Sequence, residues 1–124
     1  MNVMKIQIGG DYLISNYQSV ELINDLGLNY IQGNIIKLIT HYCQDRKNVY
    51  LEKIIHYCEL GKILRFKSTA KWNADKVNRY ILENKITNIH LYTFSALCRG
   101  HYDVVKNEFC EILNKRAESN DNTR

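Results

Sequence analysis

Apolar residues recur at helical spacing through the middle of the chain. Within each of two sets, the apolar residues follow one another mostly at steps of three or four. The first set is Ile31, Ile35, Leu38, Ile39 and Tyr42, and the second is Leu51, Ile54, Ile55 and Cys58. This spacing places each set in one stripe along a helix with 3.6 residues per turn. The polar run 44–48 between them has the length of a loop. The pattern therefore predicts two helices, over 29–44 and 48–60, that fold back on each other as a hairpin.

Further helices are predicted before and after this hairpin. Apolar stripes and residues typical of helix ends indicate helices over 18–26, 68–84, 88–99 and 101–116. The first of these is expected to bury Val20, Ile23 and Leu26. Asparagine often begins a helix and glycine often ends one. The predicted caps of the hairpin helices are Asn29 and Asn48, and the predicted stops are Gly27, Gly61 and Gly100.

Short stretches of strand character lie before the first helix and after the hairpin. Residues 4–8 alternate apolar and polar side chains, and residues 12–14 follow a glycine-rich turn. Residues 63–67 are also short and alternating. The predicted fold is mainly α (α+β), a compact bundle of about six helices around the central hairpin, with a small N-terminal β-hairpin or sheet. Residues 1–116 are expected to form one globular domain and 117–124 a disordered tail.

Composition restricts the class of protein. A length of 124 residues suffices for one domain with its own core. The chain has no apolar run of roughly 20 residues and no hydrophobic leader, which favours a cytoplasmic protein without membrane contact. Its four widely spaced cysteines are interpreted as free thiols. The chain has a net charge of +4, and residues 62–79 alone carry +5, because they contain six basic residues and one aspartate. This stretch is either a solvated surface or a patch for an acidic partner.

Metal binding and nucleophilic catalysis are two alternative interpretations of the histidines, cysteines and acidic residues. His41 and His56 could meet across the hairpin, but two ligands do not make a zinc site. A cysteine nucleophile needs a base beside an accessible thiol, whereas Cys58 lies in the apolar stripe. Four acidic residues could hold Mg²⁺ together with a nucleotide: Glu21, Asp25, Glu52 and Glu59. No metal or cofactor is assured by these patterns, and we predict no catalytic residue from them.

The first turns of the predicted 29–44 helix suggest contact with an anion. Glycine inside a helix costs up to about 1 kcal/mol relative to alanine, so Gly33 needs a reason. Close approach of a ligand phosphate is one reason, and tight helix packing is another. Lys37 lies one turn after Gly33 and could meet the same anion.

The residues of the hairpin also resemble a family. The segments Gly33-Asn34-Ile35-Ile36-Lys37, Lys47-Asn48, Leu51-Glu52-Lys53 and His56-Tyr57 are similar to a small bacteriophage-associated domain of unknown function, linked to phage nucleotide kinases of the T-odd type. The resemblance covers roughly residues 17–61. It implies a phage origin, hence the host cytoplasm, and contact with a nucleotide. The sequence departs from the family pattern at Leu38, His41, Tyr50 and Ile54, which removes an arginine and an aspartate and argues against inherited catalysis.

The leading hypothesis is a phage-type accessory protein that binds a nucleotide or nucleotide-derived signal without strong turnover, sequestering it from host defence. The expected ligand-binding residues are Asn34, Lys37, His41, Lys53, His56, Arg65 and Lys67. The second hypothesis is a protein-interaction module that inhibits or redirects a host protein through residues 62–79 and exposed tyrosines. The third is a nucleotide kinase or pyrophosphatase that uses Mg²⁺. Nucleic acid is the least favoured partner, and a homo-oligomer stays open.

Overall fold

Six α-helices make up the structure, a computed structural model that describes residues 17–65 and 67–119. They are α1 (Ser19–Leu26), α2 (Tyr30–Asp45), α3 (Asn48–Leu64), α4 (Ala74–Glu83), α5 (Leu91–Cys98) and α6 (Tyr102–Glu118). Those two ranges contain no strand. The predicted helical bundle is therefore confirmed, while the strands predicted at 4–8 and 12–14 lie outside the described residues.

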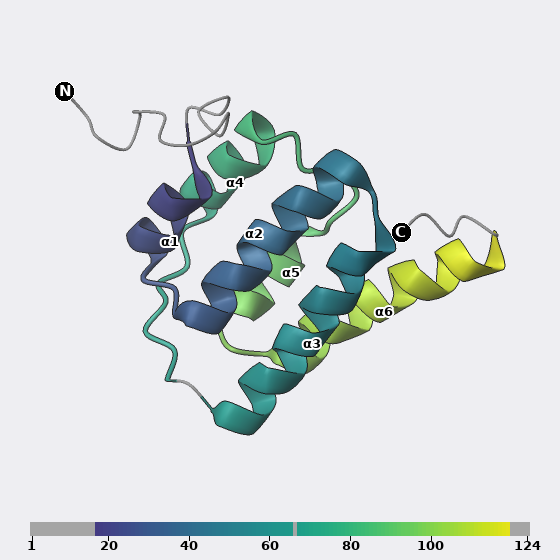
Figure 1. The fold of residues 1–124 in the computed structure, drawn as a ribbon. Coiled ribbons are helices and arrows are strands. Elements are labelled where there is room, and N and C mark those ends of the chain that lie inside the picture. The colour runs from purple at the N-terminus through teal and green to yellow at the C-terminus, as the bar shows by residue number, and fades with distance from the viewer. Residues whose placement is uncertain (1–16, 66, 120–124) are drawn as a thin grey trace, which may run out of the picture.

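The predicted central hairpin is present as α2 and α3. Asn29 caps α2 as expected, because its side-chain oxygen accepts a hydrogen bond of 2.8 Å from the backbone nitrogen of Gln32. The prediction that Asn48 caps α3 was wrong, because Asn48 is the first residue of that helix and Lys47 is in the cap position. After α2, Arg46 takes a left-handed conformation and turns the chain toward α3. Figure 1 shows α2 in the middle of the molecule, with α1 and α4 on one side and α3, followed by α6, on the other.

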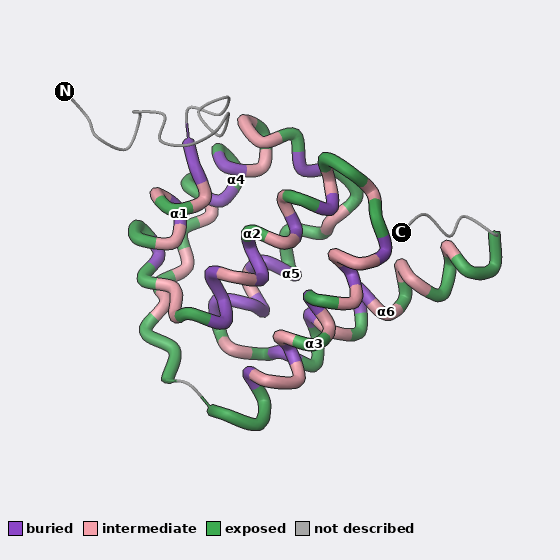
Figure 2. The backbone as a smooth tube through the Cα atoms, in the orientation of Figure 1, coloured by how far each residue is buried: buried purple, intermediate pink, exposed green. Residues whose placement is uncertain are grey.

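The core lies mainly under α2 and α5. Figure 2 shows many buried residues on these two helices, and α3 and α6 contribute further buried residues. Ile35, Ile39 and Leu51, all fully buried, belong to the stripes that the sequence pattern identified. In α1 the prediction was partly wrong, because Leu22 and Leu26 are buried while Val20 is 49% exposed. No helix among the described residues is both long and apolar enough to cross a membrane.

The end of α3 was predicted incorrectly. Gly61 does not stop the helix but lies inside it, buried against the ring of Tyr102 on α6. The helix continues to Leu64, so residues 63 and 64 are helical rather than part of a strand over 63–67. Arg65 then caps the helix in a left-handed conformation. Close packing of α3 on α6, which local patterns do not report, outweighs the usual preference of glycine for helix ends.

Other helix boundaries also differ from the prediction, including the start of α5 at Leu91 rather than at residue 88. The fourth helix begins at Ala74, where Asn73 supplies the cap, rather than at residues 68 or 69. The preceding loop is held instead by contacts to distant segments, such as the hydrogen bond from the backbone nitrogen of Lys71 to the carbonyl of Leu26. The last helix continues through residues 117 and 118, which were expected to belong to a disordered tail.

A buried glutamine connects the start of α2 to two remote segments. The Gln32 side chain is fully buried, and its amide nitrogen donates hydrogen bonds to the Ser68 hydroxyl at 3.0 Å and to the Leu97 carbonyl at 2.9 Å. The Ser68 hydroxyl in turn donates to the carbonyl of Cys98. A buried amide without partners would cost stability, so these bonds fix α2 relative to the loop before α4 and to the end of α5.

Candidate functional site

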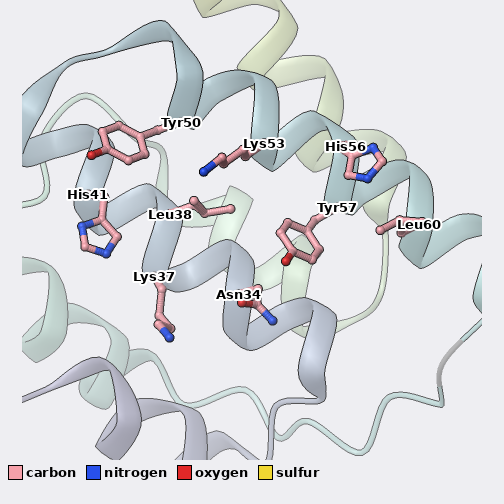
Figure 3. A pocket seen from close by; sticks show the side chains of 9 residues that line it. All are labelled: Asn34, Lys37, Leu38, His41, Tyr50, Lys53, His56, Tyr57 and Leu60. Carbon is pink, nitrogen blue, oxygen red and sulfur yellow. The ribbon is translucent and has the colours of Figure 1, made fainter. Parts of the chain in front are cut away.

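An open groove of about 590 Å³ runs along the hairpin between α2 and α3. Its walls bring together five of the seven predicted ligand-binding residues: Asn34, Lys37, His41, Lys53 and His56. Figure 3 shows these side chains on the two helices, together with the other four that line the groove: Leu38, Tyr50, Tyr57 and Leu60. Residues far apart in the sequence therefore share one surface.

Helix periodicity explains the composition of the groove. On α2 the lining positions are 34, 37, 38 and 41, and on α3 they include 50, 53, 57 and 60. Both sets advance by three or four residues, or by one, so each forms a stripe beside the buried stripe of its helix. Leu38 and Leu60 are only partly buried and pack against the core. The groove therefore combines apolar contacts with a polar rim.

Positive charge in the groove has no acidic counterpart on its walls. Lys37 and Lys53 are exposed, and no carboxylate belongs to the nine lining residues. Neither lysine forms an ion pair with another described residue. In Figure 3, Lys53 extends from α3 towards α2, whereas Lys37 extends along the outer side of α2. Lys53 is thus the central cation, and Lys37 lies at the rim.

Aromatic rings surround the two lysines. The His41 and Tyr50 rings stack across the groove with centroids 5.7 Å apart. The Tyr57 ring contacts the rings of Tyr30, at 6.5 Å, and His56, at 6.2 Å, in edge-on arrangements. These contacts hold flat apolar surfaces at the groove walls, where the ring of a ligand could stack.

Both groove tyrosines stay protonated near neutral pH. The Tyr50 hydroxyl donates a hydrogen bond of 3.0 Å to Asp45, which raises the pKa of Tyr50. Burial, aided by the neighbouring Tyr30 hydroxyl, raises the pKa of Tyr57. Since neither ring becomes an anion, the tyrosines do not offset the positive charge of the groove.

Asn34 has a narrower role than the sequence predicted. Its amide nitrogen donates a hydrogen bond of 2.8 Å to the carbonyl of Tyr30 within α2. The amide oxygen is then the group that can face a ligand, and an oxygen accepts hydrogen bonds rather than binding phosphate. The glycine before it is explained by packing, because a Cβ at Gly33 would lie 3.2 Å from Ile23 Cδ1.

Arg65 and Lys67, the other two predicted ligand-binding residues, do not line this groove. Arg65 lines a second hollow near the start of α6, and Lys67 lines neither. The difference follows from the length of α3, which carries Arg65 one turn beyond the groove residue Leu60.

The basic stretch 62–79 does not form a single positive surface. Three of its six cations pair with carboxylates: Lys62 with Asp103, Lys76 with Asp25 and Arg79 with Glu83. Arg79 also lies 4.5 Å from the centre of the Tyr17 ring. Ion pairs with carboxylates therefore neutralise three of the six positive charges in this stretch.

The acidic residues suggested for Mg²⁺ do not converge. Glu59 faces α6, where it pairs with Lys106, and Asp25 accepts a hydrogen bond of 2.7 Å from the Tyr17 hydroxyl. Among the residues that the structure describes, no group of three or more His, Cys, Asp or Glu side chains is placed to hold a metal ion. His41 and His56 share the groove, but they lack a third ligand there.

The cysteines are free, as predicted, and two of them are buried. Burial raises the pKa of Cys58 to about 12 and that of Cys98 to about 11. The nucleophilic form of a cysteine is the thiolate, so neither thiol is activated at neutral pH.

Sequence reasoning missed four groove residues as ligand contacts: Leu38, Tyr50, Tyr57 and Leu60. Their spacing was a usable signal, because positions 50, 53, 57 and 60 already form a helical stripe around the predicted Lys53. Glu52 and Glu59, which the sequence suggested for Mg²⁺, do not line the groove. No protein family, curated protein or solved structure matches this chain.

Proposed function

We propose that this protein binds a nucleotide or a nucleotide-derived signal in the groove between α2 and α3, without strong turnover. The observation that carries the proposal is the composition of the groove walls, which combine two lysines, two histidines and two tyrosines with no carboxylate. A nucleotide presents an anionic phosphate and a flat ring, and these walls offer cations for the first and aromatic surfaces for the second.

Five groove residues have a defined role in this proposal. Lys53 extends towards α2 and would contact the phosphate, with Lys37 adding charge from the rim. Tyr57 and the stacked pair of His41 and Tyr50 would contact the base or sugar. The volume of about 590 Å³ is within the usual range for small-ligand sites.

Binding without turnover is favoured over phosphoryl transfer or hydrolysis. Such reactions usually need metal ions that bridge the phosphates and a group that positions the nucleophile. The groove walls contain no carboxylate to hold a metal ion. The phage origin and the sequestering of a host signal are further parts of the proposal, and they rest on the resemblance of residues 17–61 to a phage-associated domain.

A thermal-shift screen with purine and pyrimidine nucleotides, with and without Mg²⁺, tests the proposal. A ligand present at 100 times its dissociation constant stabilises the folded state by about 2.7 kcal/mol, which raises the melting temperature by roughly 10 °C in a domain of this size. Calorimetry then measures the affinity of the best ligand. Absence of any shift across the screen, or Mg²⁺-dependent consumption of the nucleotide, would contradict the proposal.

The variant Lys53→Gln identifies the groove as the site. Loss of a charge-assisted hydrogen bond to phosphate should weaken binding about tenfold or more. The matched control is Lys71→Gln, which removes the same charge from an exposed residue that lines neither hollow. Equal affinities of the two variants would exclude the groove, even if the protein binds nucleotides elsewhere.

A further inference from the structure

A second hollow lies where the end of α3 meets the start of α6. It measures about 720 Å³, and its walls come from α3, the loop after it, the turn between α5 and α6, and the first residues of α6. The lining residues with charged or ionisable side chains are Lys62, Arg65, Arg99, His101, Tyr102 and Asp103. We propose that this hollow is a separate binding site for a phosphate group, with Arg65 and Arg99 as its principal contacts.

The charge balance of the hollow favours an anion. Lys62 pairs with Asp103 at 2.8 Å, so these two charges offset each other. Arg65 and Arg99 then remain, both exposed and neither with an ion-pair partner among the described residues. Guanidinium groups offer paired donors that match the oxygens of phosphate, and two of them around one hollow provide a net charge of about +2.

Helix dipoles do not decide the sign of the potential in the hollow. The start of α6 contributes a partial positive charge of about half a unit, and the end of α3 contributes about the same negative charge. Because these contributions oppose each other, the two arginines dominate. The α6 backbone still adds direct donors, since His101 makes no side-chain cap and the first amides of a helix lack partners within it.

A buried tyrosine also lines the hollow. Tyr102 is 6% exposed, and its hydroxyl makes no hydrogen bond of ordinary geometry with the described residues. Burial raises the pKa of Tyr102, while the nearby Asn29 side chain lowers it, so the hydroxyl keeps its proton at neutral pH. Because the hydroxyl is buried, the ring of Tyr102 shapes the wall of the hollow, and the charged contacts to a phosphate come from Arg65 and Arg99.

This inference is independent of the proposed function, because the hollow shares no lining residue with the groove. The two sites can therefore be tested separately. Lys53→Gln should leave phosphate binding in the hollow unchanged, and changes at Arg65 and Arg99 should leave the groove unchanged.

Amide NMR spectra recorded during titration with inorganic phosphate and pyrophosphate test the site. We expect saturable shifts of the Tyr102 and Asp103 backbone signals, with chloride at matched ionic strength as the reference. The double variant Arg65→Gln/Arg99→Gln should weaken binding at least tenfold. The control Lys71→Gln/Lys85→Gln removes the same charge from residues that do not line the hollow and should bind as the unmodified protein does.

The variant Tyr102→Phe examines the buried hydroxyl. Because this hydroxyl has no surface accessible to a ligand, the variant should change phosphate binding less than about twofold, and a larger loss would contradict the assignment to Arg65 and Arg99. Equal effects of phosphate and chloride, or equal weakening in the two double variants, would overturn the inference, because either result describes general attraction to a basic protein. Saturable shifts with pyrophosphate but not with phosphate would identify a site for diphosphate groups. Loss of those shifts in the double variant would support the assignment to Arg65 and Arg99, and their persistence would overturn it.

Discussion

The two faces of α3 use the same kinds of residues for different purposes. Towards α6, charged side chains form cross-helix ion pairs, Lys62 with Asp103 and Glu59 with Lys106, and the backbone is packed closely. Towards α2, Lys53 lies beside the groove without a carboxylate among the lining residues. Charges on the first face hold helices together, and charges on the second remain available to a ligand. The two faces therefore differ in whether their charges have partners within the fold, and the face towards α2 is the candidate binding surface.

Among variants that test this difference between the two faces, we expect the largest loss of stability from Gly61→Ala, on the face towards α6. An added Cβ would lie 2.7 Å from ring atoms of Tyr102, which is too close without movement of α6. Overpacking of this kind should lower the free energy of unfolding by about 2 kcal/mol, measured by urea denaturation.

Gly33→Ala is the matched control for that change, since it adds the same methyl group to α2. Its Cβ would meet the flexible end of the Ile23 side chain at 3.2 Å. Small repacking and the better helix propensity of alanine should roughly cancel. If both variants lose the same stability, the close packing of α3 on α6 is not a special feature of the fold.

A smaller effect is expected from Lys106→Met, which removes the partner of Glu59. The hydrogen bond from Lys106 lowers the pKa of Glu59 below its ordinary value. A carboxyl group with a lowered folded-state pKa stabilises the fold above its unfolded pKa, and this stability is lost as the pH falls through the folded pKa. Urea denaturation from pH 7 down to 3 should therefore show a flatter decline below about pH 5 in the variant.

The control for the pH experiment is Lys115→Met. Lys115 and Glu111 form a pair of 3.5 Å on one helix, but both side chains are largely exposed. Exposed pairs contribute little, so this variant should follow the pH profile of the unmodified protein. A profile for Lys106→Met that is parallel to both would show that the Glu59 pair does not contribute to acid sensitivity.

The smallest effect on stability is expected on the groove face. The double variant Lys53→Gln/His56→Gln should change the free energy of unfolding by no more than about 0.5 kcal/mol, because both side chains are exposed. Chemical denaturation without ligand checks this. A loss above 1 kcal/mol would mean that these residues support the fold, and the contrast between the two faces of α3 would not hold.

The sequence predicts the central hairpin well because its apolar stripes report burial directly. It predicts the end of α3 poorly. Gly61 has the identity of a helix stop, but its position is set by the Tyr102 ring, 41 positions further along the chain. Arg65 ends the helix in a left-handed conformation, a position that glycine or asparagine usually occupies. Long-range packing overrode local preference at both residues.

Part of the candidate site was predictable for the same reason as the hairpin, namely the helical spacing of its residues. Asn34, Lys37 and His41 repeat at helical steps, so a correct hairpin places them on one surface. Arg65 was misplaced because its position depends on how far α3 continues. The pairing of Glu59 with Lys106 was also beyond the sequence, since the partner of a charge on another helix cannot be identified from spacing along one helix.

The buried amide of Gln32 has a consequence for the order in which the protein folds during synthesis. Its acceptors at Ser68 and Leu97 belong to segments that the ribosome makes 36 and 65 residues later. Until those segments emerge from the exit tunnel, the Gln32 amide has no partner at these positions, so burying the start of α2 would not be favourable. The groove wall is therefore expected to reach its final structure only after residue 97 has left the tunnel, and nascent chains that stop before residue 97 should remain open to proteases at α2.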